Sequence, residues 1–359
     1  MNIHHLSHID LDGYSCQLIM KYTPYNITNY NANYGAEVRS KLDLIIENIK
    51  KKKEKTATIL ITDLNLTADE SRWLNNEVNK MREYGNEITI TLLDHHGSGE
   101  ESAKKYKWYF LDVERCATKI TYDYVKENYE FNEPEWMNKF VDIVNAVDLW
   151  KKEEVENFEY GKVCMRLVNE TRELNRAMFA TEDNNYKLSL LLAATKLIHV
   201  EDAAISLDEK IHMLKKEFFK TDKNNTLDNL ATKYVVNLLG QKRATHTIYY
   251  KGYRGFLSYG VGNTSIVGNG FLVEYPEYDF IVDVSYRGAM SLRANNQVSV
   301  AQISKEWANG GGHPNAAGGR IMGFKEQYRY DKVKQQIETL INDKESRAGI
   351  LEYKREELN

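Results

Sequence analysis

Cysteine and proline are both scarce in this chain of 359 residues, which has three of the first and four of the second. The cysteines at positions 16, 116 and 164 are odd in number, lie far apart and form no CxxC pair. This arrangement argues against a disulfide scaffold and against a thiolate zinc site. The few prolines, without any Ser/Gly-rich tract, argue against long flexible linkers. We therefore expect a chain that folds in a reducing compartment.

Long apolar segments are missing as well. The most apolar stretch, 188–200, is short and contains Lys196 and His199, so no segment is suited to span a bilayer. The opening MNIHHLSHID has neither a basic n-region nor an apolar h-region, which predicts no secretory signal. These features predict a soluble cytoplasmic protein with no membrane partner.

Charge of one sign is not in excess, since 48 Lys and Arg residues face 52 Asp and Glu residues and the formal net charge is −4. This balance excludes a general polycation that coats duplex nucleic acid through its overall field. A small local basic site is still compatible with it. The length suits two domains or one large domain.

Strand and helix patterns alternate through the first third of the chain. Such alternation indicates an α/β fold, a mostly parallel sheet with helices on both faces. The helix that begins near Thr67 opens with TADE, the pattern of a capping box. By periodicity, strands are expected at 3–9, 25–31, 56–62 and 88–93, and helices at 14–21, 37–50, 67–84 and 117–129.

The pattern becomes almost wholly helical from about residue 134 to 239, and strand patterns return from 244 onward. We therefore predict a first domain over 1–185 and a helical connector over 186–240. A second, smaller α/β domain is expected over 241–345, followed by a charged tail over 346–359.

Carboxylate and imidazole side chains follow three of the predicted strands at the point where each ends. The first strand ends in HIDLDG, in which alternate residues can share one side; the strand ILIT ends in an aspartate, and ITITLL is followed by Asp-His-His. Because the carboxyl ends of parallel strands line one crevice, we expect these groups to meet there, joined by an aspartate from an apolar helical segment. The candidates are His8, Asp10, Asp12, Asp63, Asp94, His95, His96 and Asp148.

So many carboxylates could not all stay ionised close together without cations. Imidazole and carboxylate ligands without thiolates suit Mn²⁺, Fe²⁺, Co²⁺ or Zn²⁺, and an oxygen-rich set favours Mn²⁺ or Mg²⁺. Each piece alone has an ordinary explanation, since Asp63 could cap the following helix and the pair His4-His5 is incidental. The combination in this order predicts a metal site.

A glycine-rich segment, GGGHPNAAGG at 310–319, is the second candidate functional feature. Backbone amides of glycines can approach an anion closely, and His313 and Asn315 add side-chain donors. Arg293, in the predicted strand AMSLRA, is a matching cation, because a guanidinium can bind a phosphate through two hydrogen bonds. We expect an anion site here; a flexible turn and a surface arginine are the plainer alternatives.

With these motifs the sequence resembles the DHH phosphoesterase superfamily, whose name matches Asp94-His95-His96. The segments SHIDLDG, ITDLN, LLDHHGSG and VNAVDLW are similar to its catalytic domain, and SLRAN and GGGHPNAAGG to the DHH-associated C-terminal domain. The resemblance extends over nearly the whole chain. The opening SHIDLDGYSC and the following YNANYG are most similar to the nanoRNase B type of oligoribonuclease.

The resemblance implies a binuclear site for divalent ions, Mn²⁺ first, with Mg²⁺ or Co²⁺ as other options. It implies that His8, Asp10 and Asp63 hold one metal, while Asp12, Asp63, His95 and Asp148 hold the other. His96 would face the scissile phosphate, and Asp94 would support the histidine pair from behind. The substrate's terminal nucleotide or phosphate would bind Gly311, Gly312, His313, Asn315 and Arg293.

The activity implied is that of a phosphodiester hydrolase, a 3′-to-5′ exoribonuclease that degrades short oligoribonucleotides (nanoRNA) to 5′-mononucleotides by two-metal activation of water. Its partners would be short single-stranded RNA or dinucleotides, not long duplexes. Alternatives are a 3′-phosphoadenosine-5′-phosphate phosphatase, a linear or cyclic dinucleotide phosphodiesterase, a RecJ-type DNA exonuclease, and a nucleotide-binding module without catalysis. The oligomeric state is open, a homodimer included.

Overall fold

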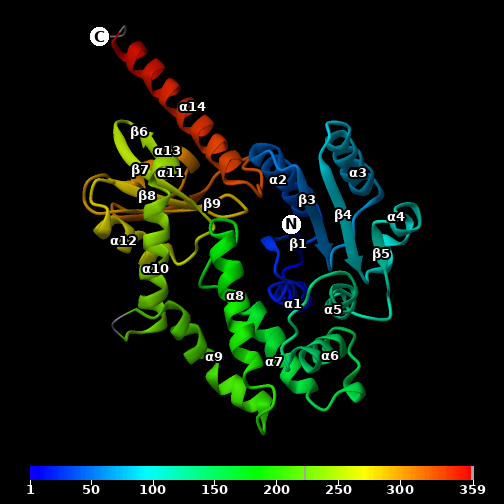
Figure 1. Cartoon of the computed structure of the whole chain (residues 1–359). Coiled ribbons are helices and arrows are strands. Elements are labelled where there is room, and N and C mark those ends of the chain that lie inside the picture. The colour runs from blue at the N-terminus through cyan, green and yellow to red at the C-terminus, as the bar shows by residue number, and fades with distance from the viewer. Residues whose placement is uncertain (222–223, 357–359) are drawn as a thin grey trace. The chain divides into compact units, whose positions relative to one another are not determined.

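The structure, a computed structural model, describes residues 1–221 and 224–356, with side chains up to residue 346 (Figure 1). Its contacts divide the chain into two compact units, Met1–Arg172 with Ala180–Phe218, and Glu173–Phe179 with Phe219–Asn359. This division is based on contacts, and the functional domain boundaries expected from the sequence remain a prediction. Within the described residues, no helix is both long and apolar enough to cross a bilayer.

The first unit is built on a sheet of five strands, all parallel, in the order β2-β1-β3-β4-β5. This confirms the parallel α/β fold class. The short β5 and the α4 helix before it were not expected from the sequence, since their apolar runs are too brief to show a period. The strands are β1 (Asn2–Ser7), β2 (Asn26–Asn31), β3 (Thr56–Thr62), β4 (Glu87–Asp94) and β5 (Tyr109–Leu111).

Two apolar clusters show that helices cover both faces of this sheet. Successive residues of β3 alternate between them: Ile59 and Ile61 pack in one cluster and Leu60 in the other, as the two-residue period of a strand requires. The first cluster joins α2 (Ala36–Lys52) and α3 (Ala68–Glu83), and the second joins α1 (Leu11–Met20), α5 (Ala117–Asn128) and α6 (Met137–Asp148). At the start of α3, Thr67 and Glu70 form the expected capping box.

The helices that follow α6 confirm the helical middle region: α7 (Phe158–Asn169), α8 (Ala180–Thr195) and α9 (Ala203–Phe219), with a short 3₁₀ turn at Lys152–Glu154. Before this region lie α4 (Glu100–Lys105) and a 3₁₀ turn at Gly97–Gly99. The three cysteines are free and buried, as the absence of a disulfide pattern predicts.

The second unit contains a mixed sheet of six strands in the order β10-β11-β9-β8-β7-β6, in which only β7 and β8 pair in parallel among the described strands. The strands are β6 (Thr247–Tyr250), β7 (Tyr253–Tyr259), β8 (Phe280–Val284), β9 (Ala289–Ala294), β10 (Gly311–His313) and β11 (Ala316–Arg320). The helices are α10 (Leu227–Gln241), α11 (Arg243–His246), α12 (Thr264–Glu274), α13 (Val300–Ala308) and α14 (Tyr330–Glu356).

Candidate metal centre

The segment that follows β1 places three candidate ligands within five residues. His8 follows the strand directly, Asp10 caps α1 by accepting a 3.0 Å hydrogen bond from the amide of Gly13, and Asp12 lies in the first turn of α1. A Cβ at Gly13 would lie 2.5 Å from the carbonyl oxygen of His8. The glycine is therefore needed because the start of α1 approaches the end of β1 closely.

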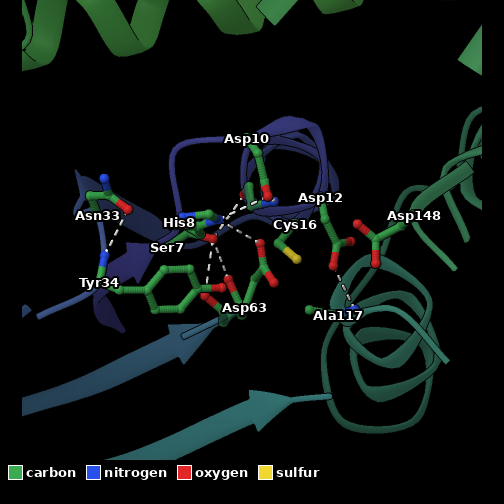
Figure 2. Close-up of polar contacts among 12 residues, drawn as sticks. Ser7, His8, Asp10, Asp12, Cys16, Asn33, Tyr34, Asp63, Ala117 and Asp148 are labelled. Atoms are coloured by element: carbon green, nitrogen blue, oxygen red, sulfur yellow. Dashed lines mark hydrogen bonds and ion pairs between the residues drawn. The ribbon is translucent and has the colours of Figure 1, made fainter. Parts of the chain in front are cut away.

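Asp63, directly after β3, lies at the middle of the group (Figure 2). Its backbone is left-handed, with φ at 56°, a conformation that Asp and Asn tolerate better than most residues. Its carboxylate points back to the strand ends instead of capping α3, whose N-cap is Thr67. Asp63 Oδ2 lies 3.6 Å from His8 Nδ1, and Asp63 Oδ1 lies 3.3 Å from His95 Nε2.

His95, after β4, faces carboxylates from three different elements. Besides Asp63, its Nε2 lies 3.6 Å from Asp12 Oδ2 and 3.7 Å from Oδ2 of Asp148, the last residue of α6. Three sets of residues therefore bring single ligand atoms within 4.8 Å of one another: His8, Asp10 and Asp63; Asp12, His95 and Asp148; and Asp63, His95 and His96. All of the metal-type candidates from the sequence meet in one place.

The donor atoms of this group suit a divalent cation. Nδ1 of His8 lies 2.9 Å from Oδ2 of Asp10 and 3.6 Å from Oδ2 of Asp63, but in the described part of the chain neither Nδ1 of His8 nor Oδ2 of Asp63, both buried, has a partner with hydrogen-bond geometry. Buried polar atoms normally have such a partner. The side chains offer oxygen and imidazole nitrogen without sulfur, because the nearby thiol of Cys16 is bonded to Thr118 and Thr121. These buried groups could hold metal ions of the kind that imidazole and carboxylate prefer.

The pKa values of these side chains also show that negative charge is in excess at this place. Burial, together with Asp12 and Asp10, raises the pKa of Asp63 well above its ordinary value, and burial with Asp12 raises that of Asp148 to about 7. Burial alone would lower the pKa of His8, but Asp10 and Asp63 outweigh it and raise it to about 10. A bound cation would relieve the repulsion between these carboxylates and so favour their ionised forms.

Asp12 is held from the other side by the start of α5. Its Oδ2 accepts a 2.8 Å hydrogen bond from the amide of Ala117 and its Oδ1 a 2.7 Å bond from the amide of Thr118. Amides at a helix N-terminus stabilise a carboxylate. The side chain of Asp12 is therefore fixed in its present orientation.

Asp94 and His96 form a hydrogen-bonded row beside the cluster. Oδ1 of Asp94 lies 2.7 Å from Nδ1 of His96, and Oδ2 of Asp94 accepts a 2.7 Å bond from the hydroxyl of Tyr109 on β5. On the opposite side of the ring, Nε2 of His96 lies 2.8 Å from the hydroxyl of Tyr34. Asp94 thus contacts His96, and no bond from Asp94 to His95 occurs in the described residues.

The candidate substrate residues lie together in the second unit. The glycine-rich segment is a β-hairpin, in which β10 and β11 are joined through Pro314 and Asn315. Arg293 of β9 pairs with Ala316 of β11, and its guanidinium donates to the hydroxyl of Ser265. Asn315 is bonded to Asn296. Gly311, Gly312 and His313 are exposed along β10, so their surface is open to a ligand.

Sequence reasoning missed two tyrosines and two amides of this site. Tyr34 and Tyr109 are among 24 tyrosines, and no spacing distinguishes them, because the contacts with His96 and Asp94 arise only in the folded sheet. Backbone amides leave no residue-type signal at all. The segment YNANYG, which contains Tyr34, was the one available indication.

No family model matches the chain, but similar proteins exist. It is 44% identical over 347 residues to a 3′,5′-cyclic-nucleotide phosphodiesterase of Helicobacter pylori (strain ATCC 700392 / 26695), across 96% of this chain and 99% of that protein. It is 22% identical over 349 residues to the oligoribonuclease NrnB of Bacillus subtilis (strain 168), across 92% and 77%. A crystal structure of an uncharacterized protein from Helicobacter pylori G27 superimposes with a TM-score of 0.89 at 43% identity, across 95% of this chain and 99% of that one.

Proposed function

We propose a specific substrate class for this chain, starting from the fact that it belongs to the DHH-type phosphoesterases and is a metal-dependent phosphodiesterase. The proposed substrate is a small nucleotide with a phosphodiester bond, and a 3′,5′-cyclic nucleotide is the first candidate. The observation that carries the metal-dependent chemistry is the gathering of histidine and aspartate side chains, all buried or half-buried, at three strand ends and α6, with their ligand atoms within 4.8 Å of one another in each set.

The proposed ligand sets follow from the distances within the group. His8, Asp10 and Asp63 would hold one divalent ion, while Asp12, His95 and Asp148 would hold a second, which Asp63 also contacts. Such ions supply Lewis acidity at the phosphoryl oxygens and a water that ionises near neutral pH. Mn²⁺ is the proposed native ion, because oxygen donors outnumber nitrogen donors in both sets.

Other roles in the proposed reaction belong to side chains of this protein. His96, oriented through Asp94, is placed at the edge of the ligand group, where it can contact the phosphoryl oxygens or the leaving oxygen. The burial of Asp63 and Asp12 excludes bulk water from the carboxylates, which strengthens their interactions with cations. No covalent intermediate with a side chain is required.

The comparisons change the order of the candidate substrates. The sequence suggested a short-oligoribonucleotide exonuclease first, but the relative with that name is only 22% identical, whereas the cyclic-nucleotide phosphodiesterase is 44% identical across nearly its full length. Hydrolysis of a small nucleotide phosphodiester, a class that includes the linear or cyclic dinucleotide named above as an alternative, is therefore the better supported proposal. A 3′-to-5′ activity on nanoRNA is the second candidate.

Turnover of matched substrates with Mn²⁺ tests this order. We expect kcat/KM for 3′,5′-cyclic AMP or GMP to exceed that for a linear diribonucleotide or 3′-phosphoadenosine 5′-phosphate by at least about tenfold, which is 1.4 kcal/mol. Chromatography of the products measures all of them together. A higher kcat/KM for the diribonucleotide would support the oligoribonuclease instead, and 5′-end-labelled oligomers would then show the polarity.

Arg293 is proposed to bind the substrate's phosphate or terminal nucleotide, because its guanidinium lies beside the hairpin that carries His313. We expect Arg293→Ala to raise KM by roughly 10- to 100-fold, since hydrogen bonds to charged groups contribute about 1.5–3 kcal/mol, with a smaller change in kcat. Arg293→Lys should restore only part of the affinity. Arg320→Ala, at the exposed end of β11, is the matched control and should leave KM unchanged.

A further inference from the structure

We propose that Tyr34 is a positioning residue that keeps His96 from coordinating the metal ions, so that this imidazole stays available to the substrate. The inference rests on the metal-dependent function proposed above and adds a residue to it. Its basis is the arrangement of Tyr34, His96 and Asp94 at the edge of the ligand group (Figure 2 shows Tyr34 beside His8 and Asp63).

Proximity alone would allow His96 to be a ligand. One ligand atom of His96 lies within 4.8 Å of ligand atoms of Asp63 and His95, which is close enough for a single ion to contact all three. Imidazole is a good ligand for Mn²⁺, Co²⁺ and Zn²⁺. Something other than distance must therefore decide whether this ring coordinates.

Hydrogen bonds already engage both nitrogens of the His96 ring. We assign the proton at the 2.7 Å contact to Nδ1 of His96, because the ionised carboxylate of Asp94 can only accept a hydrogen bond. The lone pair of a neutral ring is then on Nε2, where the hydroxyl of Tyr34 donates to it at 2.8 Å. A metal ion needs that same lone pair, so the hydroxyl and the ion compete for it.

Tyr34 is well held in this place. Its amide donates to Asn33 Oδ1 at 2.9 Å, and the amide of Asn33 donates to Glu37 Oε2 at 2.9 Å. Its ring lies over the His8 ring with centroids 4.4 Å apart. The next residue, Gly35, has φ at 84°, which a side chain would disfavour. A tyrosine hydroxyl is protonated at neutral pH, so it can donate to the imidazole.

Removal of the hydroxyl should change metal binding before any substrate is present. In Tyr34→Phe the ring still packs on His8, but Nε2 of His96 loses its hydrogen bond and is free to bind an ion. We expect Co²⁺ to bind the metal-free full chain about tenfold or more tightly, on the 10- to 100-fold scale of changes around ligands. The visible absorption of the bound Co²⁺ should change as well, because a nitrogen ligand would be added. Titration calorimetry and absorption spectra measure both effects.

A second histidine variant identifies the new ligand. The double variant Tyr34→Phe with His96→Gln should return to the Co²⁺ affinity and spectrum of His96→Gln alone. Tyr84→Phe, at an exposed tyrosine after α3, is the matched control and should behave as the unchanged chain. With bis(p-nitrophenyl) phosphate, Tyr34→Phe should lower kcat more than it alters KM, because the sequestered imidazole no longer serves the reaction.

The proposal fails if Tyr34→Phe leaves the Co²⁺ affinity and spectrum unchanged. It fails equally if the tighter binding persists in the double variant, since the added ligand would then not be His96. Neither result depends on which nucleotide the enzyme hydrolyses, so a failure of the substrate proposal would remain distinguishable.

Discussion

Asp63→Asn is expected to abolish phosphodiester hydrolysis and, at the same time, to make the metal-free protein more stable. Asp63 lies in both of the proposed ligand sets, so its loss should reduce kcat/KM by more than the roughly 100-fold that follows removal of a residue behind a ligand. Asparagine keeps the shape of the side chain and tolerates the left-handed backbone at this position. The loss would therefore come from charge and coordination, not from misfolding.

The stability gain follows from the same buried charge. Without cations, Asp63 is fully buried among Asp12 and Asp10, and these raise its pKa; a neutral amide removes that penalty. We expect the melting temperature of the chelator-treated variant to rise by roughly 2–8 °C, the shift that 1–2 kcal/mol gives a unit of about 200 residues. Asp69→Asn, at an exposed residue of α3, should change neither property. Activity above a tenth of the unchanged chain's would contradict the assignment of Asp63.

Chelation should remove all activity and reveal a stability that falls as pH rises from about 5 to 8. The pKa of Asp148 is raised to about 7 and that of Asp63 is raised further above the ordinary aspartate range. The folded state therefore holds protons that the unfolded chain has released, and stability is present at low pH and lost as pH rises through these values. His8, with its pKa raised to about 10, adds to the same trend above about 6.5.

Thermal unfolding at pH 5 and pH 8, with chelator and with Mn²⁺, measures this effect. The buried His5 and His246, whose pKa values are lowered to about 3, oppose this trend below about pH 6.5. We therefore expect a melting temperature only roughly 2–8 °C lower at pH 8 in chelator, from a few kcal/mol of net linkage. Mn²⁺ should flatten or reverse the trend, because binding favours the ionised carboxylates. Asp148→Asn should reduce the slope in chelator. A metal-free chain that gains stability toward pH 8 would show that the carboxylates are not crowded as described.

The sequence predicted the parallel sheet and the gathering of the acidic and histidine residues, because both depend on local pattern. Strand periodicity and the rule that ligands meet at the carboxyl ends of parallel strands place His8, Asp63 and His95 together without coordinates. The rule gives no side-chain orientation. It therefore could not predict the hydrogen bond between Tyr34 and His96 or the backbone hydrogen bonds that hold Asp12. The left-handed backbone of Asp63 was equally hidden, since its sequence also fits a helix cap.

Substrate choice lay beyond the sequence for a different reason. The motifs around Asp94 and Asp63 determine how a phosphodiester is attacked, but they contain no information about the sugar and base beyond it. That information belongs to side chains such as Arg293 and His313, whose neighbours are set by strand register. Pairing of β9 with β11 joins residues that are far apart in the chain, and no local spacing reveals it.

Two of the three carboxylates that face His95, those of Asp12 and Asp148, are held differently. Asp12 is pinned by the amides of Ala117 and Thr118, so it cannot follow an incoming ion. Asp148 is the last residue of α6, and in the described part of the chain its carboxylate has the 3.7 Å contact with His95 but no hydrogen bond. We therefore expect ions of different radius to be accommodated by a displacement of Asp148 rather than of Asp12. Mg²⁺, Mn²⁺ and Co²⁺ would then be bound with the same position of Asp12 and with different positions of Asp148.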